Sequence, residues 1–225
     1  MSMPALVFDL DGTLVDSVYQ HVLAWHEALH ATGMELSVWR IHRRIGMSGG
    51  LFARALLRET GQELDGELRV RLQDLHAQAY RRQVDQVRPL PGARALLKRL
   101  SELDCPWAIA TSGRMESAGP TLALLEVPGG VPIVTRDQVA HAKPNPDLFL
   151  EAARRLNVDP TEAIVVGDSV WDLLAARRAG ALGVGLQSGG YGREELERAG
   201  AYRVYADPAE MLTRIDEIGV RTDGL

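Results

Sequence analysis

The sequence predicts an α/β protein: a doubly wound (Rossmann-like) parallel sheet core with an inserted all-helical cap domain. Short apolar runs typical of buried strands alternate with helical patterns, and they occur at 5–8, 107–110, 133–135, 163–166, 182–186 and 202–205. Such runs, separated by helices, are typical of a parallel sheet that is covered on both faces. Residues 16–85 interrupt the alternation and contain no convincing strand. We therefore expect a core of residues 1–15 and 86–225 and a helical cap of residues 16–85.

The helical stretches carry their apolar residues on one face. In the stretch 91–103, for example, Leu96 and Leu100 are one helical turn apart. Pro146 suits the first position of a helix over 146–156, and Gly180 is a typical C-cap for the helix that follows the fourth strand. Within the cap we expect helices over 17–31, 37–45, 50–59 and 66–83, which glycines separate.

Composition narrows the class of protein. The 225 residues carry a net charge of −5, whereas nucleic-acid-binding domains usually present a basic face. No stretch is long enough to cross a bilayer, and the first residues lack the basic start of a signal peptide. The single cysteine, Cys105, cannot form an internal disulfide. These features favour a cytoplasmic protein without a nucleic-acid or membrane partner; a monomer and a homodimer both remain open.

The segment DLDGTL places two acids directly after the first strand. Ligands bind at the carboxyl ends of strands in open α/β sheets, so Asp9 and Asp11 are candidate site residues. One carboxylate can attack phosphorus and hold it covalently, and a second can protonate the leaving oxygen and then activate water. Two nearby acids also favour magnesium, and Gly12 allows a tight turn. The alternative is an acidic turn without a catalytic task.

Two further loops offer groups that suit phosphate. Thr111, Ser112 and Gly113 follow the strand 107–110, where a hydroxyl and free backbone N–H groups can bind phosphate oxygens, although such residues also make ordinary turns. Lys143, in HAKPNPD, stands just before the helix 146–156. Its charge can neutralise the build-up of negative charge on a phosphorylated Asp9. The alternative is a solvated lysine.

The segment GDSVWD ends the fourth strand with an acid and adds a second acid one helical turn later. Asp168 can complete a metal site, and Asp172 can orient Asp168, a bound water or Lys143. Ser169 and Asp172 can equally form a helix cap, and both interpretations can hold together. One parallel sheet brings all four loops to the same edge. The set then provides a nucleophile, an acid/base, a metal cage and a phosphate clamp.

With these four motifs in order, the chain resembles the haloacid dehalogenase superfamily of phosphotransferases over nearly its whole length. The resemblance implies that Asp9 is the nucleophile and Asp11 the acid/base. It also implies that Thr111 binds phosphate and that Lys143 stabilises charge. The helical insert resembles the four-helix cap of one subclass, which closes over substrate and excludes water.

The resemblance also implies a Mg²⁺ site. Its ligands would be Asp9, Asp168 and the main-chain carbonyl of Asp11, with Asp172 and Ser169 supporting the metal shell. The residues expected around the substrate and its phosphate are Gly12, His21, Ser112, Gly113 and Arg114.

The remaining choice is between activities. The second carboxyl, at position 11, suits phosphoester chemistry and sets dehalogenation aside. His21 resembles the cap histidine of the β-phosphoglucomutase branch, yet a histidine packed between helices explains it equally well. Gly49, Gly113 and Met115 stand where that mutase has an arginine and polar residues. We therefore expect a phosphatase for a small phosphorylated metabolite, such as phosphoglycolate or a sugar phosphate.

A phosphosugar mutase is the alternative activity. A non-catalytic binding protein is disfavoured because all four motifs are intact. The loop GMSGG (46–50) can read substrate in the cap, and it can equally be a turn between helices.

Overall fold

The computed structural model describes residues 3–47, 49–60 and 66–221, and it contains the predicted sheet. Six parallel strands run in the order β5-β4-β1-β6-β7-β8. Their bounds are Ile133–Val134 (β5), Trp107–Ala110 (β4), Ala5–Phe8 (β1), Ala163–Gly167 (β6), Leu182–Leu186 (β7) and Ala201–Tyr205 (β8). All six lie where apolar runs predicted strands, so the predicted fold class is confirmed.

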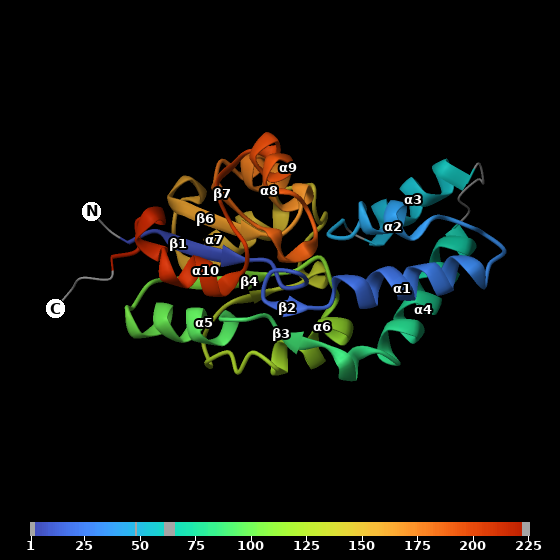
Figure 1. Cartoon of the computed structure of the whole chain (residues 1–225), viewed down its shortest axis with the longest axis horizontal. Helices are drawn as coiled ribbons and strands as arrows, with labels where there is room; N and C mark the ends of the chain where they lie inside the picture. The colour runs from blue at the N-terminus through green and yellow to red at the C-terminus, as the bar shows by residue number, and fades with distance from the viewer. Residues whose placement is uncertain (1–2, 48, 61–65, 222–225) are drawn as a thin grey trace.

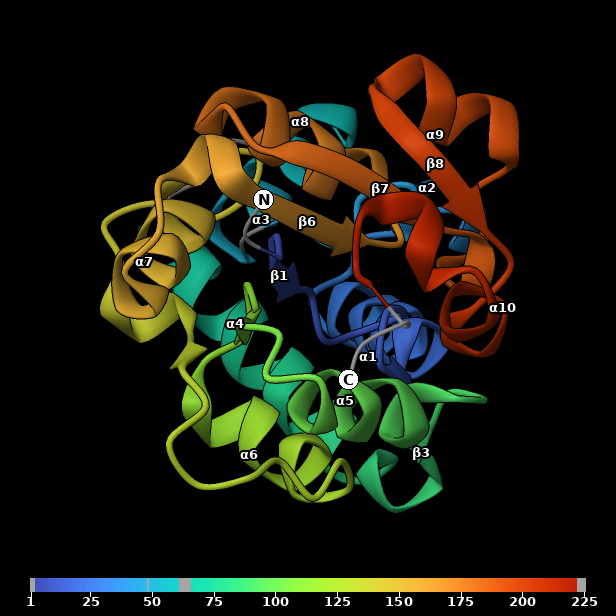
Figure 2. The ribbon, with the colours of Figure 1, turned by 90° about the vertical axis from the view of Figure 1, so that its left-hand side faces the viewer.

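Helices cover both faces of this sheet because its central strand is apolar on both. Along β1, Leu6 and Phe8 enter one core cluster and Val7 enters the other. The first cluster includes residues of α5 (Ala93–Glu102), α6 (Met115–Ala123) and α10 (Pro208–Thr213), and the second includes residues of α7 (Asp147–Leu156) and α8 (Val170–Ala179). α9 (Arg193–Ala199) packs beside β8. Figure 2 shows α7 and α8 on the opposite side of β1 from α5 and α10.

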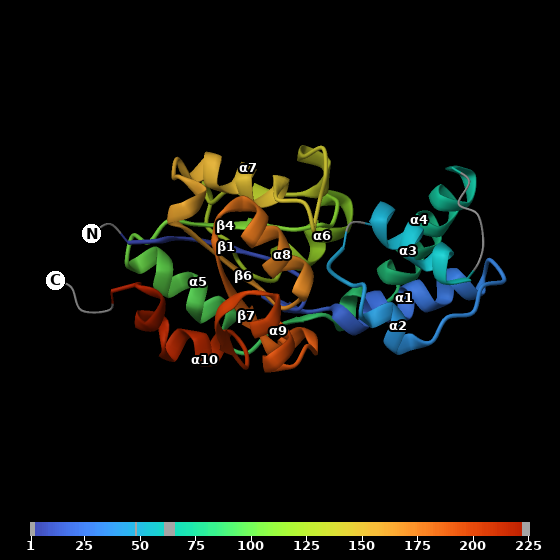
Figure 3. The ribbon, with the colours of Figure 1, turned by 90° about the horizontal axis from the view of Figure 1, so that it is seen from above.

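The insert between the first strand and the rest of the core is helical. It contains α1 (Val18–His30), α2 (Val38–His42), α3 (Gly49–Thr60) and α4 (Gly66–Arg81). Trp25, Phe52 and Leu72 belong to its own apolar cluster. Helix α2 ends earlier than predicted, because residues 43–46 form turns. Figures 1 and 3 show the insert beyond the carboxyl ends of the strands, at the end of the molecule away from both termini.

A short strand pair that the sequence did not predict lies at the base of the insert. β2 (Val15–Asp16) pairs antiparallel with β3 (Arg88–Pro89). Two residues are too few to produce a recognisable alternation of apolar and polar positions. The pair joins the segment where the chain enters the insert to the segment where it returns to the core. The domain boundaries at 15/16 and 85/86 stay a prediction.

Short 3₁₀ helices complete the structure. They are Val84–Gln86, Arg136–Gln138, Pro160–Glu162, Gln187–Gly189 and Ile215–Ile218. Among the helices of the described ranges, none combines the length and the apolar character needed to cross a membrane.

Candidate active site

The carboxyl edge of the sheet gathers the polar residues predicted from the four motifs. Asp9 follows β1, Thr111 follows β4 and Asp168 follows β6, while Lys143 lies in the loop between β5 and α7. Each of these side chains belongs to a residue no more than 3% exposed. Burial of four such groups together requires that they satisfy one another or bind a ligand.

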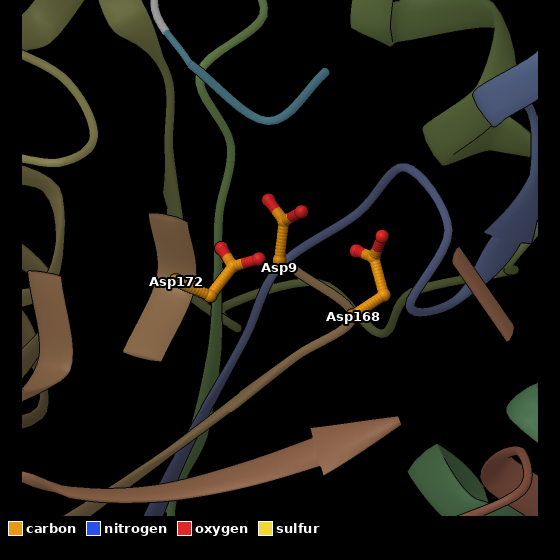
Figure 4. Close-up of side chains that lie close together, drawn as sticks. All are labelled: Asp9, Asp168 and Asp172. Atoms are coloured by element: carbon orange, nitrogen blue, oxygen red, sulfur yellow. The ribbon is translucent and has the colours of Figure 1, made fainter. Parts of the chain in front are cut away.

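Three carboxylates meet at this edge. Asp9, Asp168 and Asp172 each offer an oxygen, and these oxygens lie within 4.8 Å of one another. Asp172 comes from the first turn of α8, and Figure 4 shows Asp9 between it and Asp168. All three residues are buried.

Lys143 is the cation of this cluster. Its fully buried ammonium pairs with Asp9 and, at 2.8 Å, with Asp172. Asp172 also accepts hydrogen bonds from the Ser169 backbone N–H at 3.1 Å and from the Ser169 hydroxyl at 2.6 Å. Asp172 therefore caps α8 and holds Lys143 at once, so that the two interpretations of GDSVWD are compatible.

The crowding of charge alters the protonation of the cluster. Burial raises the pKa of Asp9 to about 7, the charge of Lys143 opposes that rise, and the charges of Asp172 and Asp11 add to it. Burial, and next the charge of Asp172, hold the pKa of Asp168 well above its usual range. For Lys143, burial alone would lower the pKa, but Asp172 and Asp9 together raise it above its ordinary value. Lys143 is thus charged, and its single positive charge faces three carboxyl groups.

The donor set fits a hard divalent cation. Three buried carboxylates face one ammonium, and Mg²⁺ takes oxygen ligands of this kind. The raised pKa values of Asp9 and Asp168 point the same way, because a bound cation would relieve the repulsion between them. The main-chain carbonyl of Asp11 as a further ligand stays a prediction.

Thr13, Ser188 and Gly189 lie close to Asp168 or to the predicted Gly12, and the sequence did not predict them as site residues. The Thr13 hydroxyl donates a 3.0 Å hydrogen bond to Asp168 Oδ1. A Cβ on Gly189 would lie 1.7 Å from Asp168 Oδ2, and one on Gly12, where φ is +80°, would lie 2.6 Å from it. Ser188 donates to the Gly12 carbonyl at 2.6 Å. Two features of the sequence could have pointed to these residues. Thr13 stands within the motif DLDGTL, and Ser188 and Gly189 follow a strand (β7) just as Ser112 and Gly113 follow β4.

The carboxylate of Asp11 is turned toward the insert. Its Oδ1 accepts a hydrogen bond from the Ser17 hydroxyl at 2.6 Å and lies 3.3 Å from His21 Nε2. Burial by itself would raise the pKa of Asp11, but the charge and hydrogen bond of His21, together with Ser17, lower it below its ordinary value. His21 thus contacts Asp11 and also packs between α1 and α4, against Tyr80.

The loop after β4 contacts the insert. Thr111 Oγ1 accepts the Gly113 N–H at 3.0 Å, and the Ser112 hydroxyl donates to the Gly46 carbonyl at 3.2 Å. Arg114 lies apart from the acidic cluster: its side chain is 70% exposed and approaches Asp137 at 3.7 Å. The structure therefore brings Thr111, Ser112 and Gly113 to the site edge, and leaves Arg114 at the surface.

The insert also contacts the first turn of α8 and the loop that follows β7. His42 Nε2 lies 2.7 Å from the Gly189 carbonyl, and the Arg43 carbonyl accepts hydrogen bonds from Trp171 Nε1 at 3.3 Å and Tyr191 at 3.0 Å. In the loop 46–50, Ser48 lies outside the described residues, and Gly49 and Gly50 begin α3. These contacts cover the carboxyl edge from the side of the insert.

Fold and site together define an α/β enzyme class, in which a carboxylate-centred site lies under a helical insert. The family described as haloacid dehalogenase-like hydrolase matches residues 3–180. The chain belongs to this family, and the predicted family membership is confirmed.

Three known proteins are similar to this chain over most of its length. Hexitol phosphatase A of Escherichia coli is 31% identical over 80% of this chain and 81% of its own length. Phosphoglycolate phosphatase of Rhodobacter capsulatus is 32% identical over 79% of this chain and 81% of its own length. A hydrolase from Pseudomonas syringae, whose crystal structure is known, is 53% identical, covers 96% of this chain and 99% of its own, and has a TM-score of 0.93. These relatives confirm the expectation of a phosphatase-type hydrolase.

Proposed function

We propose that the chain hydrolyses the phosphate monoester of a small metabolite, with Mg²⁺ and through an aspartyl-phosphate on Asp9. The observation that carries this proposal is the placement of Asp9. It is a buried carboxylate beside Lys143, in a cluster of three acids at the carboxyl end of the central strand. Relatives named for hexitol phosphate and phosphoglycolate support a small phosphorylated substrate. The net charge of −5 argues against a nucleic-acid partner, and the single cysteine fits a reducing cytoplasm.

The first step transfers the phosphoryl group to the protein. An oxygen of Asp9 attacks phosphorus, the bond from phosphorus to the ester oxygen breaks, and Asp11 gives a proton to the leaving alkoxide. The form of the enzyme that carries out this step is the one with Asp11 protonated, although His21 and Ser17 favour its carboxylate. Lys143, which pairs with Asp9, offsets the negative charge that builds up around phosphorus. The Thr111 hydroxyl accepts the Gly113 N–H and keeps its own hydrogen to donate to a phosphate oxygen.

The second step returns the enzyme to its starting state. Asp11, now a carboxylate, takes a proton from water as that water attacks phosphorus. The bond from phosphorus to Asp9 breaks, and inorganic phosphate leaves. Contacts of the insert with the loops after β4 and β7 exclude bulk water during the first step, so that the alcohol leaves before hydrolysis.

Asp9 and Asp168, with Asp172 close by, would hold Mg²⁺, which would supply Lewis-acid stabilisation of phosphate oxygens. The rest of the electrostatic task falls to the chain itself. Thr13 fixes the orientation of Asp168, while Ser169 and Lys143 fix that of Asp172. Each carboxylate of the cluster therefore has a partner that holds it in place.

Asp9→Asn tests this proposal. The variant should fold with an unchanged circular dichroism spectrum and release no phosphate from p-nitrophenyl phosphate or from a panel of hexitol, hexose and glycolate phosphates. Retained turnover would remove Asp9 from the mechanism. The panel should also be scored with a coupled assay for glucose 6-phosphate formed from β-glucose 1-phosphate, because isomerisation without free phosphate would identify the mutase activity instead.

A further inference from the structure

Arg43, at the end of α2, joins the insert to helix α9 of the core. Its guanidinium makes a two-point ion pair with Glu195: Nη1 donates to Oε2 at 3.3 Å, and Nη2 donates to Oε1. The same guanidinium lies over the ring of Tyr191, with its carbon 4.1 Å from the ring centroid. Glu195 Oε2 also accepts the Gly192 N–H at 3.0 Å. The ion pair therefore joins two side chains that each have a second contact to hold them in place.

The backbone around Arg43 lies across the candidate active site, and we call residues 42–46 the strap. The Ser112 hydroxyl donates to the Gly46 carbonyl, and a Cβ on Gly46, where φ is +93°, would lie 2.7 Å from Ser169 Oγ. Ser112 belongs to the loop after β4, and Ser169 directly precedes α8 after β6. In the sheet, β1 lies between β4 and β6. The strap therefore crosses the carboxyl end of β1, where the proposed nucleophile stands.

The ion pair lies outside the buried cluster that the strap covers. The side chains of Arg43 and Glu195 are 36% and 42% exposed, whereas the acidic cluster is buried. An open insert would leave both charges in water, and only a closed insert brings them together. Water and salt weaken such a pair, but its two-point geometry and the aromatic ring strengthen it. The pair thus favours the closed arrangement without taking part in the chemistry.

We propose that the ion pair of Arg43 with Glu195 is a catch that keeps the strap closed across the carboxyl end of β1. Arg43 and Glu195 are then positioning residues, which act on the reaction only through the strap. The kinetic part of this inference rests on the proposed function. A weaker catch lowers the population of the closed arrangement that binds substrate, so KM should rise while the chemical step keeps its rate.

The indole of Trp171 reports closure of the strap without any turnover. Its Nε1–H donates to the Arg43 carbonyl at 3.3 Å, and this hydrogen bond exists only while the strap lies on the core. Spectra that correlate ¹H with ¹⁵N in the labelled full chain show each indole N–H separately, and Trp171→Phe assigns this signal. Its rate of exchange with deuterium then measures how often the strap opens.

Two variants of the pair and a matched control define the test. Glu195→Gln removes the charge at constant size and should speed exchange of the Trp171 indole about 3- to 5-fold. Arg43→Gln also removes the contact with the Tyr191 ring and should speed it about 5- to 10-fold. The double variant should match Arg43→Gln alone, because one contact cannot be lost twice. Glu194→Gln, whose ion-pair partner lies within α9, should leave the exchange rate unchanged.

The catch should also have a kinetic and a salt signature. Glu195→Gln should raise KM about 2- to 5-fold and leave kcat within about 2-fold of wild type. Raising NaCl from about 0.05 to about 0.5 M should speed indole exchange in the wild type and have little effect in Glu195→Gln, because salt screens the attraction between two charges.

Three results would refute the proposal. Indole exchange at the wild-type rate in Glu195→Gln would show that the pair does not hold the strap. Additive effects in the double variant would show that Arg43 and Glu195 act independently. A fall in kcat with unchanged KM would place them in the chemical step. If the wild type hydrolysed no phosphate ester, the proposed function would fail, and the exchange rates would still decide whether the catch exists.

Discussion

Replacing Lys143 with methionine would leave two buried carboxylates without their cation. Lys143 is fully buried and pairs with both Asp9 and Asp172. Removal of one partner from a buried ion pair typically costs about 3–5 kcal/mol, because the remaining charge has neither water nor a counter-ion. For a chain of this size, each kcal/mol lowers Tm by roughly 2–4 °C. We therefore expect Lys143→Met to lose about 6–20 °C in metal-free buffer.

Thermal unfolding with chelator present measures the fall in Tm, and urea unfolding under the same conditions measures the loss in free energy of unfolding. Lys98→Met is the matched control for both. Lys98 has a 79% exposed side chain that approaches Glu102 at 3.8 Å, so the same substitution there should change stability by less than about 0.5 kcal/mol. Asp9→Asn in the Lys143→Met background should restore about 1–3 kcal/mol, because one unpaired carboxylate disappears. A Lys143→Met protein within about 1 kcal/mol of wild type would refute the reasoning about the cluster.

Three further predictions concern the same region and the core. Gly12 and Gly33 both have positive φ, but a Cβ at Gly12 would meet Asp168 whereas one at Gly33 meets nothing within 4 Å. In urea unfolding, Gly33→Ala should therefore cost about 1 kcal/mol and Gly12→Ala at least about 1 kcal/mol more; equal losses would contradict the close approach. Because the raised pKa values of Asp9 and Asp168 let protons compete with Mg²⁺, its affinity in titration calorimetry should fall as pH drops below about 7, with protons released on binding; an affinity independent of pH would contradict this. Burial raises the pKa of Cys105 to about 11, so a thiol reagent should label it slowly in the native protein and rapidly in urea, and rapid native labelling would refute its burial.

The strands of this fold were predictable because their apolar runs are continuous. A central strand such as β1 is buried on both faces, so its four residues are all apolar, and this signal survives without any alignment. Elements that depend on tertiary packing gave no such signal. No pattern in the sequence predicted α6 (Met115–Ala123), which contains Pro120, or the strands β2 and β3.

The candidate site shows the same division. Asp9, Lys143 and Asp168 stand in motifs at strand ends, so their meeting follows from a parallel sheet. The role of Gly189 was hidden because it depends on how closely the loop after β7 approaches Asp168 across the sheet edge. The pairing of Arg43 with Glu195 was hidden too, since it depends on how the insert lies against α9.

Direct detection of a phosphoryl group on Asp9 tests the central claim. Asp11→Asn should slow hydrolysis of the intermediate, whereas p-nitrophenolate can leave without a proton from residue 11. The variant should therefore be mixed with Mg²⁺ and p-nitrophenyl phosphate, quenched in acid, digested and analysed by mass spectrometry. The account predicts one phosphoryl group on the peptide that contains Asp9, and none in an Asp9→Asn/Asp11→Asn control. Release of phosphate by the wild type, with no phosphoryl group at residue 9 at any quench time, would contradict it.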